Sequence, residues 1–523
     1  MRILPLLTLA PLLLACSGDD GSSSGQGGGS PGSTGTSTQG SGGEGAGGGG
    51  GGAGGGGGGA SLGGHFRHGI NYGYIPGITD EQSSLLARRA GANSARLSFP
   101  ERHLETWGYD IETTDNASYV KNGITSSVVF LGGPTAAHST APAGTPDWEL
   151  DHHIPKNLYE PIFLADGNVN PDNYWATYVH KTVSTYKPWI KVWSVWNEPD
   201  WVSDWPATQT WGTEPPTKEQ LVRFGGSIYD YVRMLRITHE VAKKADPEAK
   251  VAVGGLGYPT FLSAVLRYTD DPSGGAVSGD YPEKGGAYFD VVDMHYYPIF
   301  SPGNSDQGAD GLIALKKEFQ AVLEAAGASP KEWVITETGA PHVAIQGQNS
   351  GPEYARSYLL KAMTKAQREG ILGIDWFILS DGKNPSASPF ESMGLYTNLE
   401  GIPSIDQAVL TDTGEAYATL GHVLDDARFD AASTAALGLP AGVEGAAFRV
   451  SADPAAKKAF VLWARASGAG EDAAASYDLA VPGAVRVYAW DSAKNGDAST
   501  PVANAGGKVS LSLVGTPQII VEE

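Results

Sequence analysis

The stretch Trp193-Ser194-Val195-Trp196-Asn197-Glu198-Pro199 joins an apolar, β-prone run to a short polar tip. Proline cannot donate a hydrogen bond to a sheet, so Pro199 ends the strand pattern and leaves the carboxyl group of Glu198 at the tip. The stretch Trp333-Val334-Ile335-Thr336-Glu337-Thr338-Gly339 repeats this order, with an apolar run, a glutamate and a glycine turn. The two stretches therefore predict buried strands that each carry a glutamate at the C-terminal end.

Six further runs resemble these two, and helical patterns separate all eight across residues 61–426. Most are nearly continuous apolar runs, which are typical of parallel strands covered on both faces. The expected strands are residues 68–72, 94–98, 126–131, 191–196, 250–254, 289–295, 333–336 and 373–379. Eight strands alternating with helices predict an α/β fold, a (β/α)8 TIM barrel. A doubly wound open sheet is the structural alternative.

The helices between these strands are expected from capping signatures and from apolar residues at helical spacing. Thr79-x-x-Gln82 is a capping-box signature, and Thr217-x-x-Gln220 predicts the start of a long helix that continues through Leu235. Further helical patterns cover residues 175–186, 311–327, 353–370 and 415–425.

The pattern changes after residue 426. Short alternating or apolar strands, separated by Gly, Pro, Asp and Asn, are expected at 446–450, 459–464, 477–481, 485–490, 508–513 and 518–521. Residues 427–523 therefore predict a small C-terminal β-sandwich domain. No catalytic cluster stands out in it, which favours a packing or accessory role.

Residues 1–15 resemble a bacterial lipoprotein signal peptide, with a basic start, an apolar run and Leu13-Leu14-Ala15-Cys16 at its end. The apolar run is too short to span a bilayer and contains two prolines. Cys16 is the one cysteine of the sequence, and we expect it to carry the lipid at the start of the mature protein. An ordinary secretory signal is the alternative.

Residues 16–60 are rich in Gly and Ser and have almost no apolar side chains to bury, so they predict a disordered tether. A flexible segment of this length has a root-mean-square span of roughly 35–40 Å. It would lift a catalytic domain clear of a lipid surface. We expect a lipid-anchored protein of the bacterial cell envelope, at the outer membrane or the cell surface.

The formal net charge of −22 argues against nucleic acid as a partner, because nucleic-acid-binding proteins usually carry a basic surface. It also argues against electrostatic docking on anionic lipid. Membrane contact is therefore expected only through the lipid on Cys16.

Barrel enzymes place their chemistry at the C-terminal ends of the strands. The side chains expected there are Arg96 on the second strand, Asn197 and Glu198 on the fourth, His295 and Tyr297 on the sixth, Glu337 on the seventh and Trp376 on the eighth. Two glutamates on well-separated strands that face one cavity suggest a pair of carboxyl groups on either side of a glycosidic bond.

These motifs resemble clan A of the glycoside hydrolases, the retaining barrel enzymes with glutamates on strands four and seven. Asn197-Glu198-Pro199 is similar to the clan's acid/base motif, Ile335-Thr336-Glu337 to its nucleophile strand and His295-x-Tyr297 to its strand-six motif. Within the clan, Phe130-Leu131-Gly132 on strand three and the stretch from Asn168-Val169-Asn170-Pro171 to Trp196 resemble family 39, which contains β-xylosidases. Family 5 is the next most similar. Its members often have a histidine at strand three, where this chain has Gly132-Gly133-Pro134.

The resemblance implies double displacement without a cofactor or metal. Glu337 would attack the anomeric carbon as a carboxylate, and Glu198 would be the acid and then the base, with the carboxyl groups about 5–5.5 Å apart. Glu198 must then be harder to ionise than Glu337. Substrate-binding residues would support the pair: Arg96 and Tyr297 stabilise Glu337, Asn197 bonds the sugar 2-hydroxyl, His295 belongs to the strand-six motif and Trp376 forms the floor under the sugar ring.

The substrate expected from this resemblance is a polysaccharide or oligosaccharide with β-glycosidic bonds, cleaved in a β-xylosidase-like, xylanase-like or endoglucanase-like reaction. Two rival functions stay open: a non-catalytic surface lipoprotein that binds glycan in the same groove, and a transglycosylase that uses the same residues. The sequence leaves the sugar, and exo or endo attack, undecided.

Overall fold

The structure is a computed structural model that describes residues 65–300, 303–328, 330–468 and 470–523. The predicted signal peptide, the lipidation site at Cys16 and the tether of residues 16–60 lie outside the described residues.

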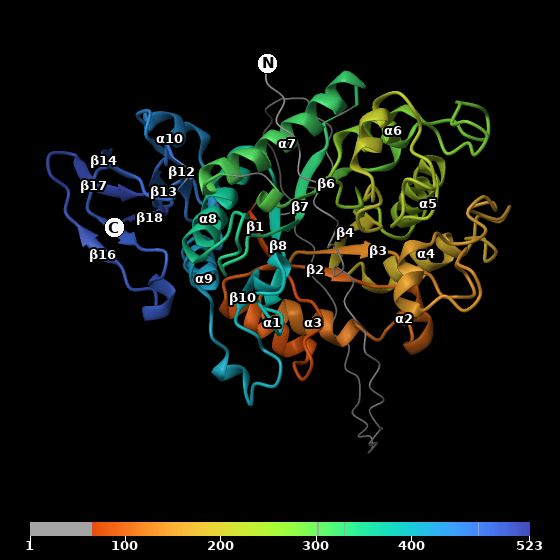
Figure 1. The fold of residues 1–523 in the computed structure, drawn as a ribbon, viewed down its shortest axis with the longest axis horizontal. Helices are drawn as coiled ribbons and strands as arrows, with labels where there is room; N and C mark the ends of the chain where they lie inside the picture. The colour runs from red at the N-terminus through yellow and green to blue at the C-terminus, as the bar shows by residue number, and fades with distance from the viewer. Residues whose placement is uncertain (1–64, 301–302, 329, 469) are drawn as a thin grey trace, which may run out of the picture.

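Eight parallel strands close into a barrel in sequence order, with β8 paired to β1 (Figure 1). This confirms the predicted (β/α)8 barrel and excludes the doubly wound open sheet. The strands are β1 (Arg67–Asn71), β2 (Ser94–Ser98), β3 (Ser127–Leu131), β4 (Ile190–Val195), β5 (Lys250–Val253), β6 (Val291–Tyr296), β7 (Glu332–Thr338) and β8 (Gly373–Trp376).

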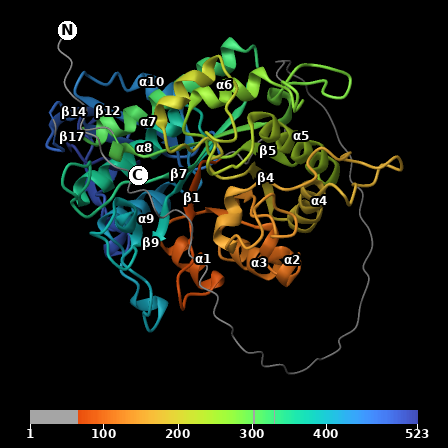
Figure 2. The same ribbon diagram turned by 45° about the vertical axis from the view of Figure 1, so that its right-hand side comes forward.

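Helices surround the barrel strands, as Figures 1 and 2 show from two directions. They are α1 (Asp80–Arg89), α2 (Glu101–Trp107), α3 (Thr113–Lys121), α4 (Tyr174–Tyr186), α5 (Ile228–Ala245), α6 (Pro259–Arg267), α7 (Ser305–Ala325), α8 (Pro352–Arg368) and α9 (Asp412–Leu424). The capping box predicted at Thr79 and Gln82 is present at the start of α1.

Short 3-10 helices lie in the connections: η1 (Asp147–His152), η2 (Trp205–Gly212), η3 (Gly285–Tyr288), η4 (Pro298–Phe300), η5 (Pro389–Ser392), η6 (Ile405–Gln407) and η7 (Ser492–Asn495). Among the helices of the described residues, none combines the length and the apolar character that crossing a membrane requires.

The prediction of a helix from Thr217 onward is wrong. The side chain of Gln220 does accept a hydrogen bond from the Thr217 amide, but it closes only a turn. Gly225, at φ +69°, breaks the helical path, and α5 begins at Ile228 behind a capping box made by Ser227 and Asp230. The residues between β4 and α5 are therefore a long loop over the end of the barrel.

Two other boundaries differ from expectation. Helix α7 starts at Ser305, six residues before the expected position, because Asn304 caps it. The eighth strand ends at Trp376, and the chain continues into β9 (Ile378–Ser380), which pairs with β10 (Gly394–Tyr396) in a separate two-stranded sheet.

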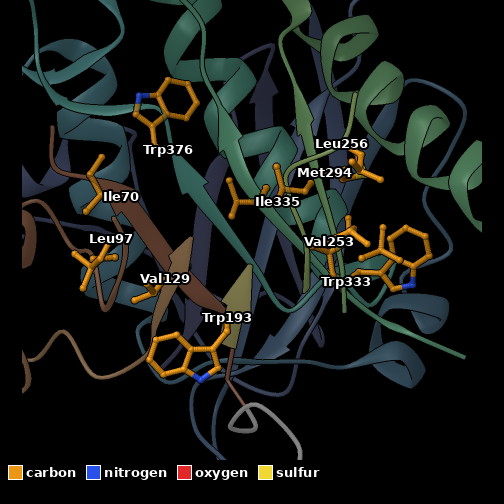
Figure 3. Packing of buried hydrophobic residues seen from close by; sticks show 14 of the residues in the cluster. Ile70, Leu97, Val129, Trp193, Val253, Leu256, Met294, Trp333, Ile335 and Trp376 are labelled. Carbon is orange, nitrogen blue, oxygen red and sulfur yellow. The ribbon is translucent and has the colours of Figure 1, made fainter. Parts of the chain in front are cut away.

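The barrel strands bury apolar side chains on both faces. Outward-facing residues such as Leu97, Val129 and Trp193 join the main core between the strands and the helices, where Figure 3 shows them. Inside the barrel, a smaller apolar cluster consists of Val128, Val192, Ala252, Val291 and Val334. Burial on both faces explains why the strands were nearly continuous apolar runs in the sequence.

The C-terminal residues form a small antiparallel sandwich beside α8 and α9 (Figure 1). A six-stranded sheet contains β11 (Arg428–Phe429), β12 (Val443–Arg449), β13 (Lys458–Ala464), β18 (Gln518–Glu522), β15 (Val485–Tyr488) and β16 (Thr500–Val502), and a second sheet pairs β14 (Ala474–Ala480) with β17 (Lys508–Val514). A short helix, α10 (Ala431–Ala436), follows β11. The short elements β11, β16 and α10 were not predicted.

A buried ion pair between two barrel helices also contacts the sandwich. Asp306 of α7 lies 2.9 Å from the ammonium group of Lys361 on α8, and it also accepts a 2.8 Å hydrogen bond from the indole of Trp463 on β13. Both charged side chains are almost fully buried. Because an unpaired buried charge is costly, this contact constrains how the sandwich packs on the barrel.

Candidate active site

A β-bulge in β7 sets the direction of Glu337. Between two β6 residues, Asp293 and His295, the pairing advances by two positions, whereas on β7 it advances by three, from Val334 to Glu337. The pairing with β8 shifts in the same way. The extra residue lets both Thr336 and Glu337 face the barrel interior, although neighbours on a regular strand point to opposite faces.

The Glu337 carboxylate is buried and surrounded by donors. The guanidinium of Arg96 on β2 forms an ion pair with Oε1, and the Tyr297 hydroxyl donates a 2.7 Å hydrogen bond to Oε2. Burial by itself would raise the pKa of Glu337. The charges of His295 and Arg96, together with the hydrogen bonds from Tyr297 and Arg96, outweigh burial and lower this pKa below its usual value.

The end of β4 turns through two left-handed residues, Trp196 at φ 72° and Glu198 at φ 47°. The Trp196 amide bonds to Leu131 on the β3 side, and the Glu198 amide bonds to Gly254 on the β5 side. Such backbone angles are unfavourable for non-glycine residues and persist where the surrounding structure holds them. Here they present the Glu198 side chain, which is 18% exposed, at the mouth of the barrel.

His295 lies between the two glutamates. Its Nδ1 is 3.0 Å from Oε1 of Glu198 and 3.6 Å from Oε2 of Glu337, and its Nε2 is 3.0 Å from the Thr336 hydroxyl. Burial lowers the pKa of His295, but the charge of Glu337 and the contact with Glu198 raise it more, so the net pKa is raised. A protonated ring would donate from both nitrogens.

The two carboxyl groups lie close together. An oxygen of Glu198, an oxygen of Glu337 and a ring nitrogen of His295 are all within 4.8 Å of one another. This spacing resembles the separation of about 5–5.5 Å in retaining glycosidases and is shorter than the 6.5–9.5 Å or so of inverting ones.

A group of buried polar side chains, Thr336, Asp293 and Ser194, supports His295 on the Nε2 side of its ring. The Thr336 hydroxyl contacts both carboxylate oxygens of Asp293 at 2.7 and 2.8 Å, and Ser194 donates to the same carboxylate at 3.1 Å. Burial raises the pKa of Asp293, against the opposing charges of His295 and Arg96. Asp293 stands two positions before His295 in the sequence, so strand periodicity could have placed it on this face.

Arg96 connects the two glutamate-bearing strands. Besides Glu337, its guanidinium donates to the side-chain oxygen of Asn197 at 2.5 Å and lies over the ring of Phe130 at 4.6 Å. Asn197 is therefore held next to Glu198, with its side chain part-exposed.

The prediction that Trp376 forms the floor under the sugar ring is wrong. Trp376 is fully buried, and its indole N–H donates to the Met393 carbonyl at 2.7 Å (Figure 3 labels it among the buried residues). It pairs with Thr338, whose hydroxyl meets Tyr358 of α8, so this face of the strand points to the helices. The next residue, Phe377, is part-exposed and its ring centre lies 5.7 Å from that of Tyr297.

Sequence reasoning missed Arg223. Its Nη1 donates to Oε2 of Glu198 at 2.7 Å, from the loop that was expected to be helical. No sequence pattern marked this residue, because its position depends on how that loop folds over the barrel.

Two groups of acidic residues in the described part of the chain bring ligand atoms close enough for a cation: Glu198 with His295 and Glu337, and Asp80 with Glu112 and Asp115. In the first group the guanidinium groups of Arg96 and Arg223 already occupy the carboxylates. A metal ion would have to displace or repel these charges, so this donor set does not fit one.

No family profile matches the sequence, and no curated protein does either. Solved structures do share the fold. A family 39 glycoside hydrolase from the gut symbiont Bacteroides cellulosilyticus WH2 has a TM-score of 0.58 at 17% identity, over 88% of this chain and 81% of that one.

Two further solved structures are similar. A GH30 endoxylanase from Clostridium papyrosolvens C71 has a TM-score of 0.51 at 13% identity, over 88% of this chain and 96% of its own. A monomeric β-xylosidase from Caulobacter crescentus CB15 has a TM-score of 0.52 at 15% identity, over 87% and 95%. The chain therefore shares the barrel fold of these glycoside hydrolases, as its strand pattern predicted.

Proposed function

We propose that this chain, which has the fold of the clan A barrels, is a retaining glycoside hydrolase that cleaves β-glycosidic bonds by double displacement. The observation that carries the proposal is the placement of Glu198 and Glu337, whose oxygens come within 4.8 Å at the C-terminal ends of β4 and β7. That gap is close to the one a nucleophile and an acid/base need on either side of an anomeric carbon.

In the first step, Glu337 attacks the anomeric carbon and forms a glycosyl ester. Its depressed pKa supports this role, because the nucleophile must be ionised. Glu198 gives its proton to the leaving oxygen at the same time. The C–O bond breaks, and the leaving alcohol departs with that proton.

In the second step, Glu198 takes a proton from water as the water oxygen attacks the same carbon. The ester bond to Glu337 breaks, the carboxylate returns to its contacts with Arg96 and Tyr297, and the product keeps the β configuration. Asn197, held by Arg96, is placed to bond the sugar 2-hydroxyl.

The proposed substrate is a β-linked polysaccharide or oligosaccharide, of the xylan or glucan type. The fold is shared with an endoxylanase and a β-xylosidase. Trp148 in η1 and Trp205 in η2 are 50% and 58% exposed, on loops that follow β3 and β4. Loops in these positions border the catalytic face of a barrel, where flat exposed rings can stack on sugars.

The stereochemistry of the product tests the proposal. With an aryl β-xyloside or β-glucoside, proton NMR of the first turnovers should show the β anomer of the sugar before mutarotation. The Glu337→Ala variant should lose turnover, and azide should restore it with an α-glycosyl azide product. Initial release of the α anomer by the wild type would contradict the retaining mechanism.

The role of Glu198 has a separate test. Glu198→Ala should still form the glycosyl ester from substrates with good leaving groups, seen as a burst, but should fail on natural saccharides, whose leaving groups need a proton. Equal losses for both substrate types would contradict the acid/base role. Glycan binding without any product would favour a binding protein, and sugar-transfer products at high acceptor concentration would favour a transglycosylase.

We also propose that Cys16 carries a lipid that anchors the enzyme to the cell envelope, with residues 16–60 as a tether. The support is the sequence Leu13-Leu14-Ala15-Cys16 at the end of an apolar run. Labelled palmitate should enter the wild-type protein in bacteria, and Cys16→Ser should abolish the labelling and release the protein from membranes. Unchanged membrane association of Cys16→Ser would contradict this proposal.

A further inference from the structure

Arg223 is fixed to the end of β4 at three points. Its carbonyl oxygen accepts a 2.9 Å hydrogen bond from the Trp196 indole, two residues before Glu198. Its Nη1 donates to Oε2 of Glu198 at 2.7 Å, and its guanidinium carbon lies 4.6 Å from the centre of the Trp201 ring. The side chain is 17% exposed. The residues on either side of Glu198 therefore help to hold the arginine that binds it.

The loop segment that carries Arg223 is itself tightly packed. Leu221 and Phe224 are fully buried, and Gly225 lies at φ +69° against the loop after β3. A Cβ atom on Gly225 would come within 2.2 Å of the His152 carbonyl oxygen. Such close packing leaves the Arg223 side chain little freedom to leave Glu198.

The two oxygens of Glu198 have different partners. Arg223 binds Oε2, whereas Oε1 faces His295 at 3.0 Å. Bonded at both oxygens, the carboxyl group cannot rotate without breaking one of these contacts. The contact with Arg223 is also an ion pair, in which the guanidinium carries a permanent positive charge.

We infer that Arg223 is a positioning residue that orients the Glu198 carboxyl group through its charged hydrogen bond to Oε2. The inference rests on the proposed function, in which Glu198 is first an acid and then a base. By stabilising the carboxylate that remains after proton donation, Arg223 assists departure of the leaving group. By the same contact it makes Glu198 a weaker base toward water, so it favours the first step over the second.

Other charged and titratable groups also face Glu198. His295 on β6 and Glu337 on β7 lie within 4.8 Å of Glu198, and Asp200 and Tyr258 lie on the side of α6. Asp200 is buried, which raises its pKa to about 7 although the amides of Gly257 and Tyr258 donate to it. All these groups remain when Arg223 alone is replaced, so a comparison of variants isolates the arginine.

Carbon NMR of the full-length protein, labelled with ¹³C at the glutamate carboxyl carbons, measures the charge of Glu198 directly. Glu198→Gln identifies its signal. In Arg223→Gln the midpoint of the Glu198 titration should lie at higher pH than in the wild type, and in Arg223→Lys, which keeps the charge, the change should be clearly smaller. The same midpoint in Arg223→Gln and wild type would overturn the inference.

Arg356 offers a matched control. It also lies over a tryptophan, Trp490 at 4.4 Å, it pairs with Asp412 at 3.3 Å, and its side chain is 14% exposed. Arg356→Gln should leave the Glu198 midpoint unchanged. If Arg223→Gln does not fold, Arg223→Met, which keeps the apolar stem over Trp201, takes its place. A midpoint that moved equally in the Arg356 variant would also overturn the inference, because it would show a general effect of lost arginines.

Activity supplies a second readout. The alkaline limb of the kcat/KM profile reports loss of the acid's proton in the free enzyme, so it should move to higher pH in Arg223→Gln and stay in place in Arg356→Gln. A wild type that cleaves no glycoside would refute the proposed function, while the NMR titration would still decide the charge effect of Arg223. An active Arg223→Gln with an unmoved limb would overturn the role of Arg223 in catalysis.

Discussion

The hydroxyl group of Tyr297 donates a 2.7 Å hydrogen bond to Oε2 of Glu337, on the carboxylate proposed to attack the substrate. Tyr297→Phe removes this donor and keeps the ring. A hydrogen bond to a charged group contributes about 1.5–3 kcal/mol, so kcat/KM should fall roughly 10–100-fold. Because the bond helps to lower the pKa of Glu337, the acid limb of the profile should also move to higher pH.

The neighbouring Tyr296 is the control for this change. Its hydroxyl lies next to Gly311 on α7, outside the barrel. Tyr296→Phe should therefore keep the wild-type pH profile. If both tyrosine variants shifted the acid limb equally, the hydrogen bond to Glu337 would not be the cause of that shift.

Arg96→Met should destabilise the fold, because it leaves the Glu337 carboxylate buried without its ion pair. Removing one partner of a buried pair costs about 3–5 kcal/mol. The folded pKa of Glu337 is depressed, so the stabilisation is present above the unfolded value of about 4.3 and is lost as the pH falls through the folded pKa. Urea unfolding at pH 7 and at lower pH should show the wild type and the variant converging; a constant difference would argue against this linkage.

His295 should make stability fall toward alkaline pH. Its folded pKa is raised, so the contribution of the protonated ring is complete below the unfolded value of about 6.5 and is lost as the pH rises through the folded pKa. His295→Gln should flatten the dependence of the unfolding free energy on pH above 6.5. Parallel curves for the two proteins would show that His295 does not gain proton affinity on folding.

The adjacent aromatic residues Trp376, at the end of β8, and Phe377, just after it, should respond differently to replacement. Trp376→Ala empties a fully buried site and should lower the unfolding free energy by about 3–5 kcal/mol. Phe377→Ala, beside Tyr297, should mainly raise KM for the glycoside. Thermal unfolding and steady-state kinetics on both variants measure this; a raised KM with normal stability in Trp376→Ala would reverse the assignment.

Much of the barrel was predictable from the sequence, because its strands are buried on both faces and leave apolar runs with polar ends. Glu198 and Glu337 stood out for this reason. The orientation of β8 could also have been predicted: the charged Asp375 stands between Ile374 and Trp376, so strict alternation places Trp376 on the face opposite Asp375.

The remaining features depend on contacts between distant segments. Thr217 and Gln220 do form the local contact of a capping signature, but the left-handed backbone at Gly225 prevents a helix from continuing past it. The position of Arg223 follows from that loop packing against Trp196 and His152, which are 27 and 71 residues earlier in the chain. Local propensity carries no information about such pairings.

The added residue in β7 places Thr336 and Glu337, two consecutive residues, on the same side of the sheet. One is tied to Asp293 and His295 while the other carries the carboxylate proposed as the nucleophile, so a single rigid peptide unit joins the anchor and that carboxylate. Loss of one residue between Val334 and Glu337 would restore even pleating and leave the carboxylate facing inward. The Thr336 hydroxyl would then leave the interior, so Asp293 and His295 would lose the anchor between them.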